Sequence, residues 1–212
     1  MTEILPPYDL RTAVRHLKRA DPVLSALITR VGSCRLRMRF FAHPFEALLR
    51  AIVHQQLSGQ AAATIYGRLT GLFPPAVGIS PSAVVALPDR VLRGAGLSRN
   101  KVLAVKDLAA KTLEGIVPEQ GDLDGLSDEE IIGRLTSVRG VGRWSVEMLL
   151  IFTLGRPDVL PVDDLGVRKG FRAAYGMKRM PANSTMLRAA KCWKPYRSVA
   201  SWYLWRAADM SN

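Results

Sequence analysis

Residues 138–144 read Val138-Arg139-Gly140-Val141-Gly142-Arg143-Trp144, with two glycines between two segments of helical periodicity. The segment before them opens on Ser127-Asp128-Glu129-Glu130, a capping-box pattern, and predicts a helix to about residue 138. The segment from Trp144 to Leu154 predicts a second helix. Glycines allow a sharp turn, and the amide groups exposed at a helix N-terminus attract anions. The stretch therefore predicts a helix, a tight hairpin that can hold a phosphate, and a second helix.

The charge of the whole chain favours a polyanionic partner. Among 212 residues, 30 are Lys or Arg and 18 are Asp or Glu, which gives a net charge of +12 and a pI near 10.3. Nucleic acid is the leading candidate, and an anionic membrane surface is the second. A bare Gly-x-Gly turn would be an ordinary helix–helix connection, but Arg139 and Arg143 beside it favour anchoring of a DNA backbone. Such contacts position a protein without reading sequence.

Several classes of protein are disfavoured by composition. Hydrophobic residues make up 48% of the chain, enough for the core of one large domain or two small ones. No apolar run approaches the roughly 20 residues of a spanning helix, and the N-terminus lacks a signal-peptide pattern, so we expect a soluble intracellular protein. Cys34 and Cys192 stand far apart, without a Cys/His cluster, which excludes a thiolate iron–sulfur cluster or a structural zinc site. We expect both cysteines to be reduced thiols.

The spacing of apolar residues predicts an all-α protein of about ten helices. Residues 9–31 are expected to form two short helices separated at Asp21-Pro22, because Asp can cap a helix and Pro can occupy its first position. Residues 33–41 alternate basic and apolar side chains and could form a strand, but we favour an extended connector. Further helices are predicted at 45–53, 61–73, from Ser80-Pro81, 98–113, 164–175, 185–189 and 198–206.

Two adjacent acids, Asp163 and Asp164, follow Pro161-Val162 and precede a predicted helix. A single acid at this place would be an ordinary helix cap. With two, one can cap while the other faces a cleft, where a carboxylate could stabilise positive charge on a sugar or orient a water molecule towards it.

Five ordered motifs together resemble the helix-hairpin-helix DNA glycosylase superfamily, and within it the 3-methyladenine DNA glycosylase II branch. The resemblance covers roughly residues 40 to 206. The motifs are Phe45-x-x-Leu48-x-x-x-Ile52-x-x-Gln55-Gln56-Leu57-Ser58, Gly96-Leu97-Ser98-x-x-Lys101, the hairpin with Trp144, Pro161-Val162-Asp163-Asp164, and Trp193-Lys194-Pro195-Tyr196-Arg197-Ser198.

The resemblance implies a compact fold without the N-terminal α/β domain of larger relatives. Two helical subdomains would flank a catalytic cleft. Residues 44–154 would form the central one, with the helix-hairpin-helix motif at about 127–154, and residues 1–43 with 155–212 would form the other.

The resemblance also implies a role for each matching residue. Asp164 would be the catalytic aspartate, and Asp163 would cap the helix. The hairpin residues Arg139, Gly140, Val141, Gly142 and Arg143 would bind the DNA backbone. Gln56 would fill the gap left by a flipped nucleotide, with Gln55 and Ser58 in the same DNA-binding loop.

Other implied features concern the base pocket and a cation. Trp144 and Trp205 would line the pocket, and Met148 stands where some relatives carry a Tyr. The backbone carbonyls of Thr136, Val138 and Val141 would hold a monovalent cation, Na⁺ or K⁺. No cofactor would be required.

The implied reaction is hydrolysis of the N-glycosidic bond of alkylated bases, of the 3-methyladenine and 7-methylguanine type, flipped from duplex DNA. Lyase relatives of the endonuclease III type carry a catalytic Lys where this chain has Trp144, so we predict a monofunctional glycosylase. A non-catalytic helix-hairpin-helix protein that recognises DNA damage is the main alternative, and a glycosylase/lyase for oxidised bases is a third. We expect a monomer in the cytoplasm, associated with a bacterial nucleoid, or in the nucleus of a eukaryote.

Overall fold

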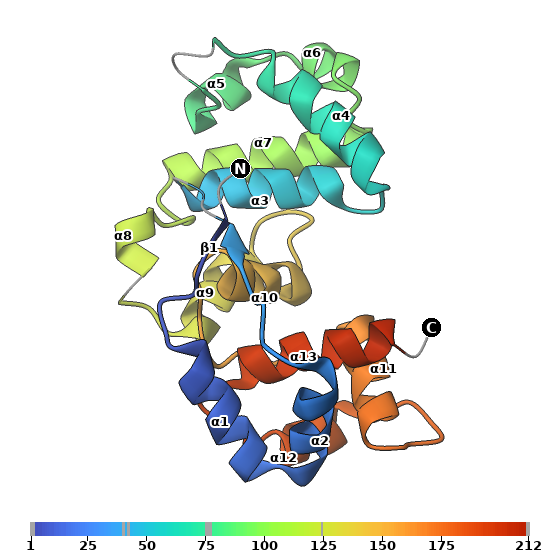
Figure 1. Ribbon diagram of the computed structural model, residues 1–212. Coiled ribbons are helices and arrows are strands. Elements are labelled where there is room, and N and C mark those ends of the chain that lie inside the picture. Colours follow the sequence, from blue (N-terminus) through green and yellow to red (C-terminus); the bar gives the residue numbers. More distant parts are fainter. Residues whose placement is uncertain (1–2, 40, 42, 75–77, 124, 211–212) are drawn as a thin grey trace. The chain divides into compact units, whose positions relative to one another are not determined.

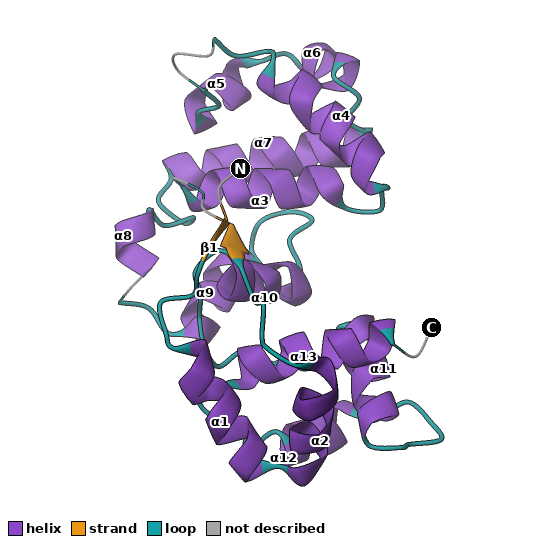
Figure 2. Cartoon of the chain, viewed as in Figure 1, coloured by secondary structure: helices purple, strands orange, loops and turns teal. Residues whose placement is uncertain are grey.

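The computed structural model describes residues 3–39, 41, 43–74, 78–123 and 125–210. Within these ranges the chain forms 13 helices and one ladder of two short strands (Figures 1 and 2). The all-α prediction is confirmed. The chain divides into two compact units, Met1–Phe40 with Leu150–Asn212 and Phe41–Leu149. Below, these are the terminal unit and the central unit, and each is described by itself.

Serine caps four of the helices of the central unit. Its helices are α3 (Pro44–His54), α4 (Gly59–Thr70), α5 (Pro81–Ala86), α6 (Asp89–Gly94), α7 (Arg99–Leu113), α8 (Gln120–Leu123), α9 (Asp128–Leu135) and the first part of α10 (Arg143–Phe152). Ser58, Ser80, Ser98 and Ser127 each cap a helix by accepting a backbone N–H bond. The predicted capping box at Ser127 and Glu130 is present. Helices α3 and α7 pack side by side (Figure 1).

The terminal unit is organised around its last helix. It contains β1 (Glu3–Ile4), α1 (Leu10–Ala20), α2 (Pro22–Val31), β2 (Met38–Arg39), the end of α10, α11 (Leu165–Ala174), α12 (Asn183–Ala189) and α13 (Arg197–Asp209). Helix α13 contacts α1, α2 and α11, and its side chains Tyr203 and Leu204 are fully buried. At Gly170 of α11 the two backbones meet so closely that an added Cβ would lie 1.8 Å from the Leu204 carbonyl oxygen.

A buried acid joins three parts of the terminal unit. Asp21 caps α2, as the Asp-Pro pair predicts, through N–H bonds from Val23 and Leu24. It also accepts a hydrogen bond from the Trp193 indole at 2.8 Å and one from the Tyr175 hydroxyl. Burial and the contact with Asp21 raise the pKa of Tyr175 well above its ordinary value, so the phenol stays a donor.

Two local predictions needed correction. The connector expected at residues 33–41 contains β2, which pairs antiparallel with β1 through Glu3–Arg39 and Ile4–Met38. The alternation of basic and apolar residues there is a strand pattern, and its partner strand lies too far away in sequence to be recognised. Helices α6 and α8 were not predicted because they span six and four residues, too few to show a period. Among the described residues, no helix is long and apolar enough to span a membrane.

Candidate functional site

In the terminal unit, Asp164 lies at the N-terminus of α11 and accepts two hydrogen bonds on one oxygen. Its Oδ1 accepts from the backbone N–H of Val167 at 2.7 Å and from the indole Nε1 of Trp205 at 2.8 Å. The backbone of Asp164 is extended, as a capping residue requires. The carboxylate is therefore fixed both by its own helix and by a side chain from α13.

This geometry corrects the prediction that Asp163 caps the helix. Asp164, not Asp163, caps the helix, because α11 begins at Leu165 and the residue directly before it holds the capping position. Asp163 is exposed, and its Oδ1 accepts a hydrogen bond from Asn183 Nδ2 at 2.7 Å. Capping leaves the negative charge of Asp164 in place, so the catalytic role implied for it stays a prediction.

A glycine allows Trp205 to lie across the start of α11. A Cβ at Gly166 would come within 2.8 Å of Trp205 Cδ1 and 3.1 Å of Asp164 Oδ1. The Trp205 ring also packs against Phe152, with ring centroids 5.5 Å apart. The indole is half-buried, and its N–H donates to the carboxylate. Its predicted place in a base pocket is untested.

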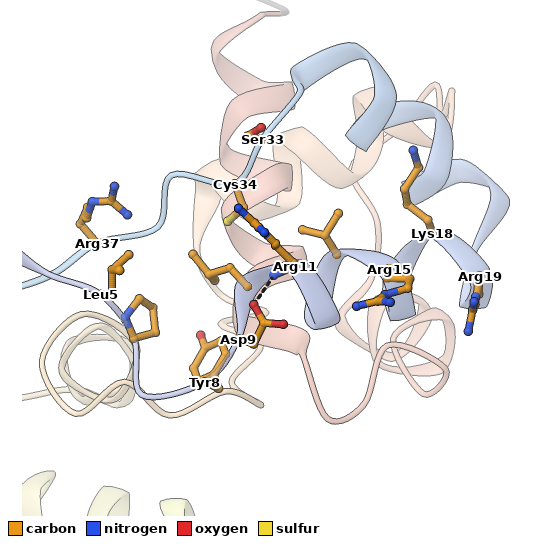
Figure 3. A pocket seen from close by; sticks show the side chains of 13 residues that line it. Leu5, Tyr8, Asp9, Arg11, Arg15, Lys18, Arg19, Ser33, Cys34 and Arg37 are labelled. Atoms are coloured by element: carbon orange, nitrogen blue, oxygen red, sulfur yellow. Dashed lines mark hydrogen bonds between the residues drawn. The ribbon is translucent and has the colours of Figure 1, made fainter.

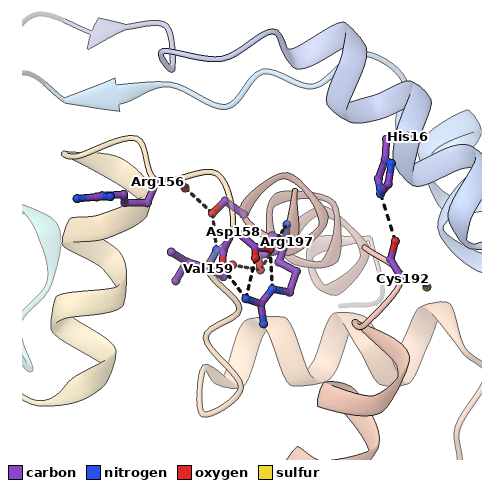
Figure 4. A network of polar contacts seen from close by, with 8 residues as sticks. His16, Arg156, Asp158, Val159, Cys192 and Arg197 are labelled. Atoms are coloured by element: carbon purple, nitrogen blue, oxygen red, sulfur yellow. Dashed lines mark hydrogen bonds and ion pairs between the residues drawn. The ribbon is translucent and has the colours of Figure 1, made fainter. Parts of the chain in front are cut away.

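A polar network holds the segment that leads to Asp164. Arg197, at the start of α13, donates to both carboxylate oxygens of Asp158, from Nε at 2.6 Å and from an Nη at 2.9 Å (Figure 4). The hydroxyl of Ser198 donates to the Arg156 carbonyl at 2.6 Å and accepts from the Val159 N–H at 3.0 Å. These contacts fix residues 156–159 against α13, a few residues before the two acids.

In the central unit, the predicted hairpin joins α9 to α10. Gly140 has a φ of +77°, which favours glycine, and the Val141 N–H closes a turn on the Val138 carbonyl at 3.0 Å. Within the described parts of the chain, the N–H groups of Gly140 and Gly142 donate to no protein acceptor. Both residues are exposed, so two backbone donors face outwards next to the N-terminus of α10.

The hairpin is braced from α7 by an acid. Asp107 Oδ2 accepts the backbone N–H of Arg139 at 2.7 Å and a hydrogen bond from Lys111 Nζ at 3.0 Å. Lys111 also donates to the Ser137 carbonyl. Partial burial acts to raise the pKa of Asp107, but the hydrogen bonds from Arg139 and Lys111 outweigh it and hold that pKa below its ordinary value. Asp107 therefore carries its charge at neutral pH.

The glutamine loop, residues 55–58, contacts the same hairpin. Gln55 Nε2 donates to the Gly140 carbonyl at 2.8 Å, while Gln56 is exposed and has a φ of +57°. A left-handed conformation costs a non-glycine residue about 1 to 2 kcal/mol, so the loop holds Gln56 in an unfavourable backbone shape.

Lys101, which belongs to one of the quoted motifs, accounts for how this loop is held. Its Nζ donates to the carbonyls of Val53 and Gln55 at 2.6 and 2.8 Å, at the C-terminal end of α3. An ammonium at a helix C-terminus is favourable because it meets carbonyl groups that lack helical partners. Desolvation lowers the pKa of Lys101.

The two hairpin arginines differ in their surroundings. Arg143 donates from Nη1 to Glu129 at 3.0 Å and from Nε to Glu147 at 3.1 Å, so its charge is shared between two carboxylates. Arg139 is exposed; its backbone N–H is bound by Asp107, and its guanidinium forms no hydrogen bond or ion pair within the described residues. The contact of both arginines with DNA stays a prediction.

The remaining predicted residues also lie in the central unit. Trp144 is 45% exposed and Met148 is half-buried, four residues apart on α10. The Val138 carbonyl accepts the turn bond from Val141, and Thr136 ends α9. The monovalent cation at these carbonyls stays a prediction. In the described ranges, no three His, Cys, Asp or Glu side chains are grouped to hold a metal ion.

Comparison with known proteins places this arrangement in a family. Residues 49–196 match the model of the HhH-GPD superfamily of base excision DNA repair proteins. The chain belongs to that superfamily. The match covers the glutamine loop, the hairpin and both acids, so it includes three of the five quoted motifs whole and most of the other two.

Two homologues span nearly the whole chain. DNA-3-methyladenine glycosylase 1 of Schizosaccharomyces pombe is 35% identical over 210 residues, covering 96% of this chain and 90% of that protein. The solved structure of a 3-methyladenine DNA glycosylase from the same yeast, in complex with abasic DNA, superposes with a TM-score of 0.81 at 35% identity, covering 92% and 95% of the two chains. A DNA-3-methyladenine glycosidase from Bacillus halodurans superposes with a TM-score of 0.84 at 31% identity, covering 98% of this chain and 93% of that one.

Proposed function

We propose that this protein is a monofunctional DNA glycosylase that hydrolyses the N-glycosidic bond of alkylated bases in duplex DNA. The observation that carries the proposal is Asp164, whose carboxylate is held by the α11 N-terminus and the Trp205 indole in a chain of the HhH-GPD superfamily. The names and the DNA-bound structure of the homologues support the substrate class.

The chemistry needs little more than a fixed negative charge. A base inside a duplex cannot be reached, so its nucleotide must be flipped out, at a cost that is lowest for weakly paired lesions. Alkylation at a ring nitrogen makes the purine cationic and a good leaving group. As the bond breaks, positive charge develops on the sugar, and Asp164 stabilises it until water attacks. A unit charge about 4 Å away contributes about 4 kcal/mol at an effective dielectric of 20, which is roughly a thousandfold in rate.

Strand cleavage is not part of the proposal. A lyase reaction needs an amine that forms a Schiff base, and the residue directly after the hairpin is Trp144, which has none. The exposed indole can instead stack on a cationic base, a contact worth about 0.5 to 2 kcal/mol.

The hairpin binds the DNA backbone in this proposal. The outward N–H groups of Gly140 and Gly142, with the guanidinium of Arg139, suit a phosphate of the backbone. Asp107, Lys101 and Gln55 hold the hairpin and the glutamine loop in shape. We propose that Gln56 fills the gap left by the flipped nucleotide. A protein that acts on DNA in this way works on the chromosome, in the cytoplasm of a bacterium or the nucleus of a eukaryote, and we propose that it acts as a monomer.

The decisive experiment compares the two adjacent acids. Purified wild type, Asp164→Asn and Asp163→Asn are incubated with duplexes that each carry one 3-methyladenine, 7-methylguanine or 1-methyladenine, and every sample is split into alkali-treated and untreated halves. We expect alkali-dependent strand breaks with wild type and Asp163→Asn, and a loss of about a thousandfold with Asp164→Asn.

The outcomes separate the alternatives. Breaks without alkali would indicate a lyase. Lesion-dependent binding without base release by wild type would indicate a damage-recognition protein. Undiminished release by Asp164→Asn would remove Asp164 from catalysis. Asparagine can still accept the bonds from Val167 and Trp205, so the loss is attributable to charge, provided that the variant binds lesion duplex as wild type does.

A further inference from the structure

The terminal unit contains a pocket that the proposed reaction does not use. It lies between α1 and residues 33–37 after α2, has a volume of about 850 Å³, and is open to solvent (Figure 3). That volume is within the usual range of sites that take a ligand or several side chains of a partner.

The pocket combines an apolar lining with a basic rim. Its apolar residues are Leu5, Pro6, Leu10 and Val14. Its basic residues are Arg11, Arg15, Lys18, Arg19 and Arg37, all of them exposed. In Figure 3, Arg15, Lys18 and Arg19 lie at one end, Arg37 and Leu5 at the other, and Arg11 between them. Leu5 is 62% exposed, so part of the apolar surface faces water.

The basic rim carries five positive charges, and only one acid, Asp9, lies beside it among the described residues of the lining. None of its five side chains forms an ion pair in the described part of the chain. Asp9, the one acid of the lining, is engaged as the α1 cap by the N–H groups of Arg11 and Thr12 and by the Thr12 hydroxyl. The hydroxyl oxygen of Tyr8, also in the lining, is buried and has no hydrogen-bond partner within the described residues.

Helix stability does not account for this arrangement. Arg11, Arg15 and Arg19 are spaced four apart, and like charges at that spacing destabilise a helix by about 0.2 to 0.5 kcal/mol per pair. Arg11 lies in the first turn, where the helix dipole disfavours a positive charge. Only the basic residues of the last turn suit the dipole. The arginines spaced four apart repel one another in the free protein, and a bound anion would relieve that repulsion.

We propose that this pocket is a docking site for an acidic segment of a partner protein that inserts an apolar or aromatic side chain between its carboxylates. The carboxylates would pair with the arginines of α1, and the apolar side chain would cover Leu5, Leu10 and Val14. A DNA backbone fits less well because phosphates use only the basic rim and leave the apolar lining exposed to water.

The probe is a display library of random 12-residue peptides, panned against the full-length protein at physiological salt. We expect selected peptides to share Asp or Glu on both sides of a Leu, Phe or Trp. Their affinity, measured by fluorescence anisotropy, should fall at least about tenfold in the triple variant Arg11→Ala, Arg15→Ala, Lys18→Ala. It should also fall in Leu5→Ser, which removes apolar contact without touching the charge.

A matched control uses Arg30→Ala, Lys191→Ala and Lys194→Ala, three exposed basic residues of the same unit outside this pocket. This control should bind the peptides as wild type does, and the pocket variants should keep base release from lesion duplexes. An absence of binders, binders without acidic residues, or equal loss in the control triple would overturn the proposal. So would displacement of the peptide by undamaged duplex together with weaker duplex binding by the pocket triple, which would assign the surface to DNA.

Discussion

Adding one methyl group at Gly170 should separate the helix that carries Asp164 from its main packing partner. The new Cβ would lie 1.8 Å from the Leu204 carbonyl oxygen and 2.5 Å from the carbonyl carbon. Both are backbone atoms, so no side chain can rotate away and the two helices must move apart by more than an ångström. A gap of 0.5 to 1 Å already loses about a quarter to a half of the dispersion energy between facing atoms.

The magnitude follows from two opposing contributions. Loss of packing between α11 and α13 resembles a severe core substitution, about 3 to 5 kcal/mol. Replacing glycine by alanine within a helix returns up to about 1 kcal/mol. We therefore expect Gly170→Ala to lower the free energy of unfolding by about 2 to 4 kcal/mol, a large part of the 5 to 15 kcal/mol typical of a folded protein.

Gly133→Ala provides the matched control. Gly133 lies within α9, is exposed, and has no atom within 4 Å of an added Cβ, so the same change should stabilise its helix by about 0.5 to 1 kcal/mol. Urea unfolding at 25 °C, followed by tryptophan fluorescence, measures both variants. Base release should fall with Gly170→Ala, because α11 carries Asp164 at its N-terminus, and should be unchanged with Gly133→Ala. Wild-type stability and activity in Gly170→Ala would refute the backbone contact on which the reasoning rests.

Three further predictions concern the site itself. Gly166→Ala should push Trp205 away from the carboxylate and lower base release about 10- to 100-fold, while the free energy of unfolding falls by only about 1 to 2 kcal/mol. Urea unfolding and a glycosylase assay, run in parallel, measure the two effects. A loss of unfolding free energy that exceeds the loss in activation free energy would contradict this prediction. Gly140 has a φ of +77°, so Gly140→Val should lower both the melting temperature and the affinity for every duplex. An added side chain at Gly142 meets open space, so Gly142→Val should lower the affinity alone. In electrophoretic binding assays, an effect confined to one lesion would argue against phosphate anchoring. Because the pKa of Asp107 is lowered in the folded state, its stabilising contribution is complete above its unfolded pKa of about 3.9 and is lost as the pH falls through the folded value. The difference in melting temperature between wild type and Asp107→Asn should therefore shrink as the pH falls below about 4. A difference that stays constant over that range would exclude the charge as its cause.

The helices were predictable from sequence where capping residues and apolar periodicity agree. Asp21-Pro22 separates α1 from α2, and the capping box at Ser127 begins α9, as predicted. Helices α6 and α8 were not predicted because four to six residues show no period and neither helix begins with a capping serine, as the equally short α5 does. Strand β2 was not predicted because it pairs with β1, which lies more than thirty residues away in the sequence.

The contacts of the candidate site residues could not be predicted from the sequence. The motif order singled out Asp164 and the hairpin, but periodicity could not fix the first residue of α11, and that one position decides which acid caps. Lys101 and Asp107 contact backbone atoms of distant segments, and the sequence has no signal for such contacts. The ion pairs of Arg143 with Glu129 and Glu147 arise from helix geometry on either side of the hairpin.

The coincidence of helix cap and negative charge in Asp164 has a consequence for how such proteins diverge. Asparagine caps a helix about as well as aspartate, and its amide oxygen can still accept from Val167 and Trp205. Under the proposed mechanism, replacing Asp164 by Asn therefore abolishes base release while the folded surface is kept. A homologue with Asn at this position would bind lesions without releasing the base and would mark them for other enzymes. The residue at this one position would therefore distinguish a glycosylase from a non-catalytic damage-recognition protein.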